Sequence, residues 1–315
     1  MRLHDLVETY ITFKRALGMR LCSEAGVLRA FCRAMGKIEV ANVKPEAVLA
    51  FIAGNGPVTA SWKQKWSVLR SFYRYAIGRN FAVTSPLPTT VPKFPQSKPP
   101  YIYSTDELKR LVVATNALQT PKSPLRALVF RTLLLLLYGT GMRIGEALSL
   151  TLHDVDLVDA VITVRDAKFF KTRLVPTGPK LTRELAAYAR RRRRQLPVLA
   201  GEASAFFAIG SGKRWHCAVV EELFRRVRKL AGVEREGDAH YQPRIHDIRH
   251  TAAQHRLITW YRAGADVQRL LPQLATYLGH VNMDSTGYYL SMTPELLHEA
   301  SQRFEHYAQP ENCDE

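Results

Sequence analysis

The chain has 315 residues, of which 46% are hydrophobic and 23% charged, and its formal net charge is +17. This length can supply two hydrophobic cores, and the ordinary hydrophobic share excludes a globally disordered protein. The basic excess indicates a polyanionic partner. It is densest near the amino end, where residues 1–100 hold 15 Lys and Arg against five Asp and Glu.

The four cysteines are scattered and form no C-x-x-C pair; they are Cys22, Cys32, Cys217 and Cys313. Dispersed thiols are typical of a reducing compartment and argue against a zinc site. The first residues lack the apolar segment of a signal peptide, and the longest apolar run falls far short of the roughly 20 residues that cross a bilayer. We therefore expect a soluble cytoplasmic protein without a membrane segment, a metal or a cofactor.

The first third of the chain is predicted to be helical. Apolar residues recur at helical spacing from Leu3 to Ile11 and after Ser23, and Pro45 opens a shorter helix that ends at Gly54. A fourth helix from about Ser61 carries aromatic residues on one face and basic residues on the others. We interpret the aromatic stripe as core and the basic faces as contacts to phosphates, which predicts a helical DNA-binding domain over residues 1–88.

A second domain follows a proline-rich linker, predicted over residues 89–103 because six prolines lie between Ser85 and Pro100. A capping box from Ser104 to Glu107 opens it, and an apolar helix from Leu125 should end at Gly139. Three short antiparallel strands are predicted at 155–157, 161–164 and 173–176, and helices after Leu181. The predicted fold class is mainly α with a small three-stranded antiparallel sheet, with this domain at 104–293 and a C-terminal helix and acidic tail at 294–315.

Six residues in five short motifs form a candidate catalytic set. Paired arginines hold the non-bridging oxygens of a phosphodiester, a proton donor releases the leaving oxygen, and a phenol can act as the nucleophile. The set consists of Arg143 in GMRIGEAL, Lys168 in KFFK, His246 and Arg249 in HDIRH, His280 in LGH and Tyr289 in YYL. In this order the motifs resemble the tyrosine recombinase (phage integrase) family.

The resemblance covers about residues 104–307 and extends more loosely over the helical amino-terminal part. It implies a two-domain architecture in which Tyr289 attacks DNA and forms a 3′-phosphotyrosyl intermediate, so that strands rejoin without ATP or a metal. It also implies that Arg143 and Arg249 hold the scissile phosphate, that His246 and His280 assist, and that Lys168 protonates the leaving 5′-oxygen.

Several of these assignments have alternatives. Tyr289 is preferred to Tyr288 because the family's nucleophile follows the third-motif histidine by nine residues. Lys171 competes with Lys168, since the family's glycine-containing turn is replaced here by two phenylalanines. Arg143, expected just inside a helix that begins near Thr140, could simply pair with Glu146, three residues away. His280 could only stabilise the end of its helix.

The resemblance implies that the partners are double-stranded DNA with specific recombination sites, other copies of the chain in a tetramer on paired sites, and companion recombinases. The motif details favour integration, excision or transposition of a mobile element over an Xer-type chromosome-resolution recombinase. A catalytically silent DNA-binding accessory protein is a third reading. The arginine run 190–194 could contact DNA or form a solvated basic face, and the acidic terminal helix could pack on a neighbouring protomer or on its own domain.

Overall fold

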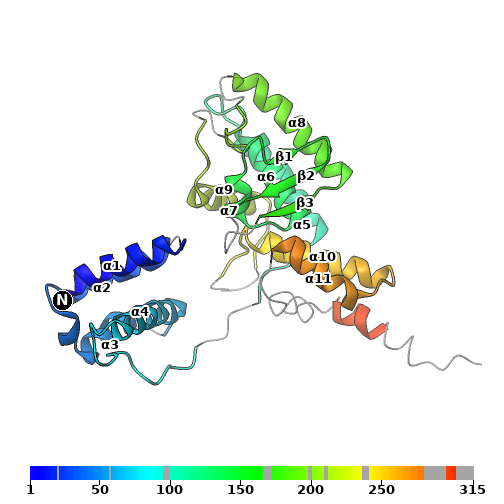
Figure 1. The fold of residues 1–315 in the computed structure, drawn as a ribbon. Helices are drawn as coiled ribbons and strands as arrows, with labels where there is room; N and C mark the ends of the chain where they lie inside the picture. Colours follow the sequence, from blue (N-terminus) through cyan, green and yellow to red (C-terminus); the bar gives the residue numbers. More distant parts are fainter. Residues whose placement is uncertain are drawn as a thin grey trace, which may run out of the picture. The chain divides into compact units, whose positions relative to one another are not determined.

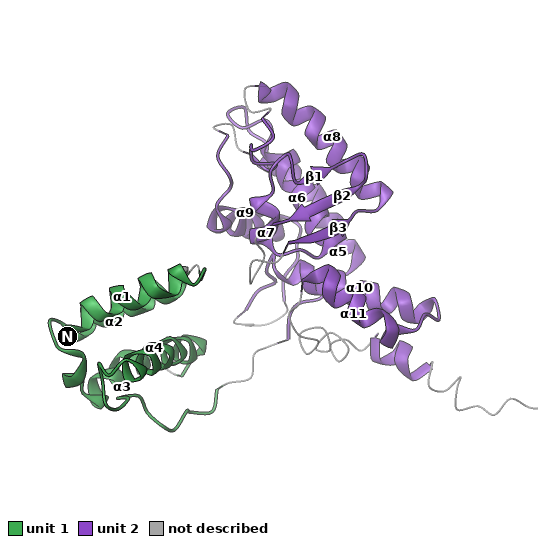
Figure 2. Cartoon of the chain, viewed as in Figure 1, with its two compact units in different colours: residues 1–98 green, residues 99–315 purple. Residues whose placement is uncertain are grey.

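The computed structural model describes residues 1–19, 21–56, 58–94, 99–165, 172–197, 201–208, 212–235, 241–279 and 296–302. The chain divides into two compact units, residues 1–98 and 99–315 (Figure 2). The predicted linker spans this boundary. Among the described residues, no helix combines the length and the apolar character that a bilayer crossing requires.

The first unit is a small helical domain (Figure 1). Its helices are α1 (Leu3–Ala16), α2 (Cys22–Met35), α3 (Pro45–Ala53) and α4 (Ala60–Gly78), with a 3₁₀ turn at Val40–Asn42. The aromatic stripe of α4 is core as predicted: Trp62, Phe72 and Tyr73 are all buried, and the ring of Tyr10 from α1 packs edge-on against Phe72.

Several basic side chains in α4, or directly after it, lie against aromatic rings. The guanidinium of Arg70 lies 5.1 Å from the centre of the Trp66 ring, and Arg79 lies 4.9 Å from the ring centre of Tyr75. Such stacking uses the face of the guanidinium and leaves its N–H edge available. The basic surface of this unit is therefore held by packing on rings as well as by charge.

The second unit is helical around one small sheet, as predicted (Figure 1). Its elements are α5 (Thr105–Ala114), a 3₁₀ helix η2 (Thr115–Leu118), α6 (Arg126–Thr140), α7 (Ile144–Ser149), β1 (Val155–Asp156), β2 (Val161–Val164), β3 (Arg173–Pro176), α8 (Pro179–Gln195), α9 (Cys217–Leu230), α10 (Asp247–Arg262) and α11 (Val267–Leu278). The apolar helix α6 is buried on most sides and packs against α8, α10 and η2.

The sheet is antiparallel, with strand order β1-β2-β3. Val161 pairs with Pro176 and Val164 with Arg173, so Arg173 is the first residue of β3 and lies at the connected end of the β2–β3 hairpin. The three strands and the capping box, in which Ser104 Oγ accepts from the backbone of Glu107, confirm the predictions.

Two predicted helix boundaries were wrong. The helix α6 continues through Gly139 to Thr140 and ends at Gly141, whose φ of +62° gives the left-handed turn. A Cβ at Gly139 would lie 2.8 Å from Leu181, so this glycine permits close packing on α8 instead of ending the helix. As a consequence α7 begins only at Ile144, and Arg143 precedes its first residue in an extended conformation.

The arginine run at the end of α8 does not form one uniform face. Arg192 is almost fully buried and donates to the carbonyl of Ala205 at 2.8 Å. Leu185 and Tyr188, buried on the same helix, are seven and four residues before it. At helical spacing this places Arg192 on the apolar face, so only the other arginines of the run are free to contribute a basic surface.

Residues 296–302 are helical and pack on their own unit. Leu296 is buried in a cluster with Leu257 of α10 and Leu274 of α11, and Glu299 pairs with Arg262 at 2.8 Å. The beginning of the predicted C-terminal helix therefore packs in cis. The expectation of packing on a neighbouring protomer now concerns residues 303–315, which lie outside the described residues.

Candidate active site

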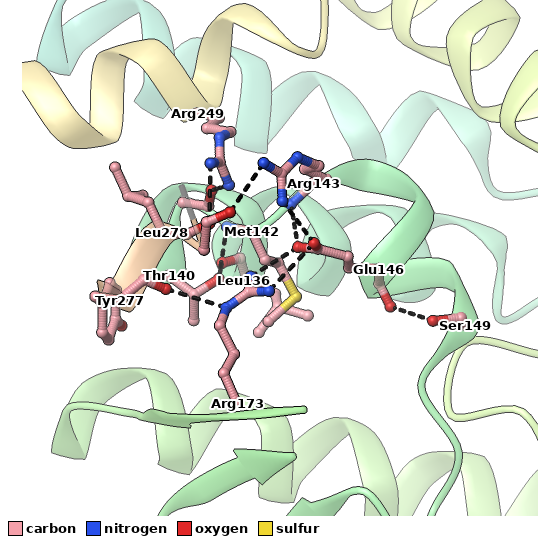
Figure 3. Close-up of polar contacts among 12 residues, drawn as sticks. Leu136, Thr140, Met142, Arg143, Glu146, Ser149, Arg173, Arg249, Tyr277 and Leu278 are labelled. Carbon is pink, nitrogen blue, oxygen red and sulfur yellow. Dashed lines mark hydrogen bonds and ion pairs between the residues drawn. The ribbon is translucent and has the colours of Figure 1, made fainter. Parts of the chain in front are cut away.

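Three arginines from three different elements meet at the carboxyl end of α11 (Figure 3). Its last carbonyls each accept a hydrogen bond from one of them: Tyr277 O from Arg173 Nε at 3.2 Å, Leu278 O from Arg249 Nη2 at 2.9 Å and Gly279 O from Arg143 Nη2 at 3.1 Å. Helix-terminal carbonyls lack partners within the helix and carry partial negative charge, so they attract cations. The next residue is the predicted site residue His280.

Arg249 is the buried member of this group. Its side chain comes from the first turn of α10, and the residue is 4% exposed. Besides Leu278 O it donates from Nη1 to Gly141 O at 2.6 Å. It therefore joins the turn after α6 to the end of α11. A Cβ at Gly141 would lie 2.5 Å from the side chain of Leu278. The two chain segments can therefore approach each other this closely because residue 141 is glycine.

Arg143 is the accessible member, with 32% of its side chain exposed. Glu146 holds it at both ends: Oε2 accepts from the Arg143 backbone at 3.0 Å, and Oε1 accepts from Nη1 at 2.8 Å. The pairing with Glu146 that was considered as an alternative to a site role is therefore present. It does not compete with that role, because it orients the guanidinium toward the turn that precedes His280.

Glu146 is shared between two arginines. Arg173 on β3 donates to it from Nη2 at 2.7 Å and from Nη1 at 3.2 Å, and both side chains are only 10% exposed. Burial alone would raise the pKa of the Glu146 carboxyl, but hydrogen bonds from Arg173 and Arg143 outweigh this effect and lower the pKa to about 2. The carboxylate therefore stays ionised at any physiological pH.

The motif around His246 has a buried and an outward part. Asp247 is 1% exposed and accepts from the Arg244 backbone at 2.9 Å, and the buried Thr251 accepts from the Tyr103 backbone at 3.0 Å. These bonds fix the start of α10. His246 is exposed and His250 is half-buried, with ring centres 5.3 Å apart.

Both histidines are biased toward the neutral form. Although solvent reaches His246, the surrounding protein and the charge of Arg249 lower its pKa, and the charge of Arg143 acts in the same direction. Burial, with the nearby His246, lowers the pKa of His250 to about 4. A neutral imidazole at pH 7 can accept a proton, so His246 fits a general base better than a general acid.

The depressed pKa of His250 predicts a pH-dependent stability. Between about pH 6.5 and pH 4 the unfolded chain binds a proton at this residue and the folded chain does not, so stability falls as the pH is lowered through this window. The shift corresponds to at most about 3 kcal/mol. Urea unfolding at pH 7 and pH 4.5 should show a smaller loss for His250→Asn than for the unchanged protein; an equal loss would contradict the assignment.

The structure thus brings together three of the six predicted site residues. Arg143 and Arg249 share the turn at the end of α11, and His246 lies within the electrostatic reach of both. The other three, Lys168, His280 and Tyr289, lie outside the described residues, as do Lys171 and Tyr288. Two functional residues were not predicted from the sequence: Glu146 as a shared carboxylate, and Arg173 as more than a residue of a strand.

The arrangement is suited to binding a phosphate. Guanidinium groups fit phosphate oxygens and remain charged at all relevant pH values. Arg143 is partly open to solvent, and the three arginines outnumber the one carboxylate between them. The described residues therefore hold preorganised positive charge at the end of α11, of the kind that stabilises anionic oxygens.

Comparison with known proteins agrees with this chemistry. Residues 103–295 match the model of the phage integrase family. "Putative integrase/recombinase y4rE" of Sinorhizobium fredii is 38% identical over 305 residues, covering 96% of this chain and 95% of the relative. Tyrosine recombinase XerC of Pelotomaculum thermopropionicum is 30% identical and covers 79% of this chain and 76% of the relative.

Solved structures support the fold. The Tn1549 transposon integrase in complex with transposon right end DNA aligns with a TM-score of 0.69 at 16% identity, covering 98% of this chain and 100% of that chain. The lambda integrase tetramer bound to a Holliday junction aligns with a TM-score of 0.63 at 20% identity, covering 90% and 78%. The family match over most of the second unit and the full-length relative are decisive: the chain belongs to the phage integrase family and is a tyrosine recombinase.

Proposed function

We propose that this recombinase cleaves one DNA strand with Tyr289, holds it as a 3′-phosphotyrosyl ester and passes it to the 5′-hydroxyl of another strand. In the forward step the phenol oxygen bonds to phosphorus while the bond to the bridging 5′-oxygen breaks. The leaving oxygen takes a proton from Lys168, and His246 accepts the phenol proton. The second transfer reverses these steps, so the bond energy is conserved.

The observation that carries this proposal is the convergence of Arg143 and Arg249 on the turn before His280. Two residues 106 positions apart in sequence are held by neighbouring carbonyls, next to the third predicted motif. Arg249 also joins the turn after α6 to the end of α11, but that structural role does not require a second arginine, Arg143, at the same turn. Two guanidinium groups held close together are suited to bind the non-bridging oxygens of a phosphate, which supports a transfer at phosphorus.

We propose that the biological role is integration, excision or transposition of a mobile element. The full-length similarity to a relative named as an integrase/recombinase and the fold similarity to a transposon integrase support this role. The XerC relative at 30% identity supports the second candidate, chromosome resolution. Terminal repeats in the DNA that flanks the gene would favour the mobile element, whereas a dependence on a partner recombinase in vivo would favour the second.

We further propose that the partners are double-stranded DNA with specific recombination sites and three other copies of the chain. The fold similarity to a tetramer on a Holliday junction supports this assembly. Exchange needs coordinated cleavage at two paired sites, which four protomers provide. The basic first unit, with its ring-supported cations, would hold the DNA, and we propose a cytoplasmic location because the substrate is DNA.

The direct test uses a duplex that the full chain selects from a randomised DNA pool, nicked next to the mapped cleavage position. The short fragment released by cleavage diffuses away, so the covalent complex accumulates. A complex that withstands denaturant and contains one tyrosyl-linked strand is the expected result. Tight and selective binding with no covalent complex would instead identify a silent accessory protein.

The lysine assignment predicts a specific rescue. Lys168→Ala should lower cleavage by about 10²- to 10⁴-fold, because the 5′-oxygen leaves poorly without a proton. A 5′-bridging phosphorothiolate should restore it, since sulfur leaves without protonation. Lys171→Ala is the matched variant and should cleave ordinary DNA normally; rescue of Lys171→Ala, with an active Lys168→Ala, would transfer the role to Lys171.

A further inference from the structure

Arg173 occupies an unusual position for a strand residue near a sheet end. Its side chain leaves β3, is 10% exposed, and reaches both the Glu146 carboxylate and the carbonyl of Tyr277 (Figure 3). It also lies against Gly279, where a Cβ would come within 2.7 Å of Nη1. The guanidinium of Arg173 thus fills the space that a side chain at position 279 would occupy.

The charges of this group decide what Arg173 contributes. Without Arg173, Arg143 and Glu146 would form a neutral pair with little attraction for a phosphate, and of the three arginines only the buried Arg249 would remain unbalanced. Arg143, Glu146 and Arg173 together hold two cations and one anion, so one positive charge is added to that of Arg249. Each carboxylate oxygen accepts one bond from Arg173, at 2.7 and 3.2 Å, and one from Arg143, at 3.0 and 2.8 Å, so the negative charge of Glu146 is shared between the two arginines. Because the group is mostly buried, this charge is weakly screened.

We propose that Arg173 is a positioning residue for DNA cleavage: it neutralises Glu146, so that Arg143 keeps its positive charge for the scissile phosphate. It does not need to touch the DNA to do so. It also ties β3, which follows the segment of Lys168, to the turn that precedes His280. The proposal rests on the cleavage chemistry proposed above and adds to it the residue that preserves the charge of Arg143.

A purely structural role for Arg173 makes a different prediction, which a change of substrate can reveal. In a methylphosphonate a neutral methyl group replaces one non-bridging oxygen, so the transition state carries one negative charge less. A variant that lacks positive charge at the site should lose much less on this substrate. A variant that is merely distorted should lose as much on both substrates.

The test measures single-turnover formation of the covalent complex by the full chain on nicked duplexes with a phosphodiester or a methylphosphonate at the cleavage position. Arg173→Gln should slow cleavage of the phosphodiester at least about thirtyfold, somewhat less than the loss of a direct oxyanion donor. On the methylphosphonate it should stay within about threefold of the unchanged protein. Arg173→Lys loses the two-bonded fit to Glu146 but keeps the charge, so it should remain within about fivefold on both.

Arg131→Gln is the matched control. Arg131 also makes a two-bonded pair with a glutamate, Glu184, at 2.6 and 3.1 Å, but this pair joins α6 to α8. The Arg131→Gln variant should cleave both substrates normally. This result would show that the loss of an arginine–glutamate pair elsewhere in the unit does not by itself slow cleavage.

Equal losses of Arg173→Gln on the two substrates, or no loss on either, would overturn the proposal. If Arg173→Gln fails to fold, Arg173→Lys decides: a tenfold or greater loss on the phosphodiester with a normal melting transition overturns it. If the proposed cleavage chemistry is wrong, the unchanged protein forms no covalent complex on either duplex. That result is distinct from an effect of Arg173→Gln, and it would also rule out the proposed role of Arg173.

Discussion

Tyr289→Phe should abolish the covalent DNA complex while leaving DNA binding unchanged. The substitution removes one oxygen atom, which is the proposed nucleophile, and retains the ring. We expect the loss of cleavage to exceed about 10⁴-fold, the scale seen when a covalent nucleophile is removed. Denaturing gels measure the complex and fluorescence anisotropy measures the binding.

Tyr288→Phe is the natural control, because it makes the same change one residue earlier. It should form the complex normally, and mass spectrometry of the digested complex should place the nucleotide on Tyr289. A complex that survives in Tyr289→Phe, or one that maps to Tyr288, would refute the assignment. The result matters because a free phenol, with a pKa near 10, is a weak nucleophile at pH 7 and needs the positive charge gathered at the end of α11.

Local patterns were sufficient to predict much of the fold. The capping box at Ser104, the three short strands and the aromatic core of α4 depend on neighbours within a few residues, and all three are confirmed. The end of α6 was misplaced because Gly139 and Gly141 look alike in sequence. Only the packing of Leu181, about 40 residues later, shows that the first of them lies inside the helix.

The missed parts of the site depend on long-range contacts. Arg173 pairs with a carboxylate 27 residues away and with a carbonyl 104 residues away, and no periodic pattern encodes either. The one local indication that Arg173 belongs to the site was its position shortly after the segment that carries Lys168 and Lys171. The buried Arg192 could have been recognised, since it continues the spacing of Leu185 and Tyr188 along one helix face.

Arg143→Ala and Arg249→Ala should each reduce cleavage by at least about a hundredfold, with much smaller losses in binding. This is the usual effect of removing one donor to a transition-state oxyanion. Binding depends on many other phosphate contacts, including those of the basic first unit. Single-turnover cleavage and anisotropy on the same duplex give the two quantities. Equal losses in both would make these arginines ordinary anchoring residues.

The two arginines should differ in stability, and the difference follows from their surroundings. Arg249 is buried, and its removal leaves Gly141 O and Leu278 O without these donors, each at a cost of about 1–3 kcal/mol. Arg143 is partly exposed, so water can replace it.

Urea unfolding should therefore show a clear loss for Arg249→Ala and a small one for Arg143→Ala, although cleavage falls in both. Arg256→Ala removes an exposed arginine two turns further along α10 and should leave stability unchanged. If Arg249→Ala were as stable as Arg143→Ala, the bonds to the ends of α6 and α11 would contribute little. Its effect on cleavage would then have to come from contact with the phosphate alone.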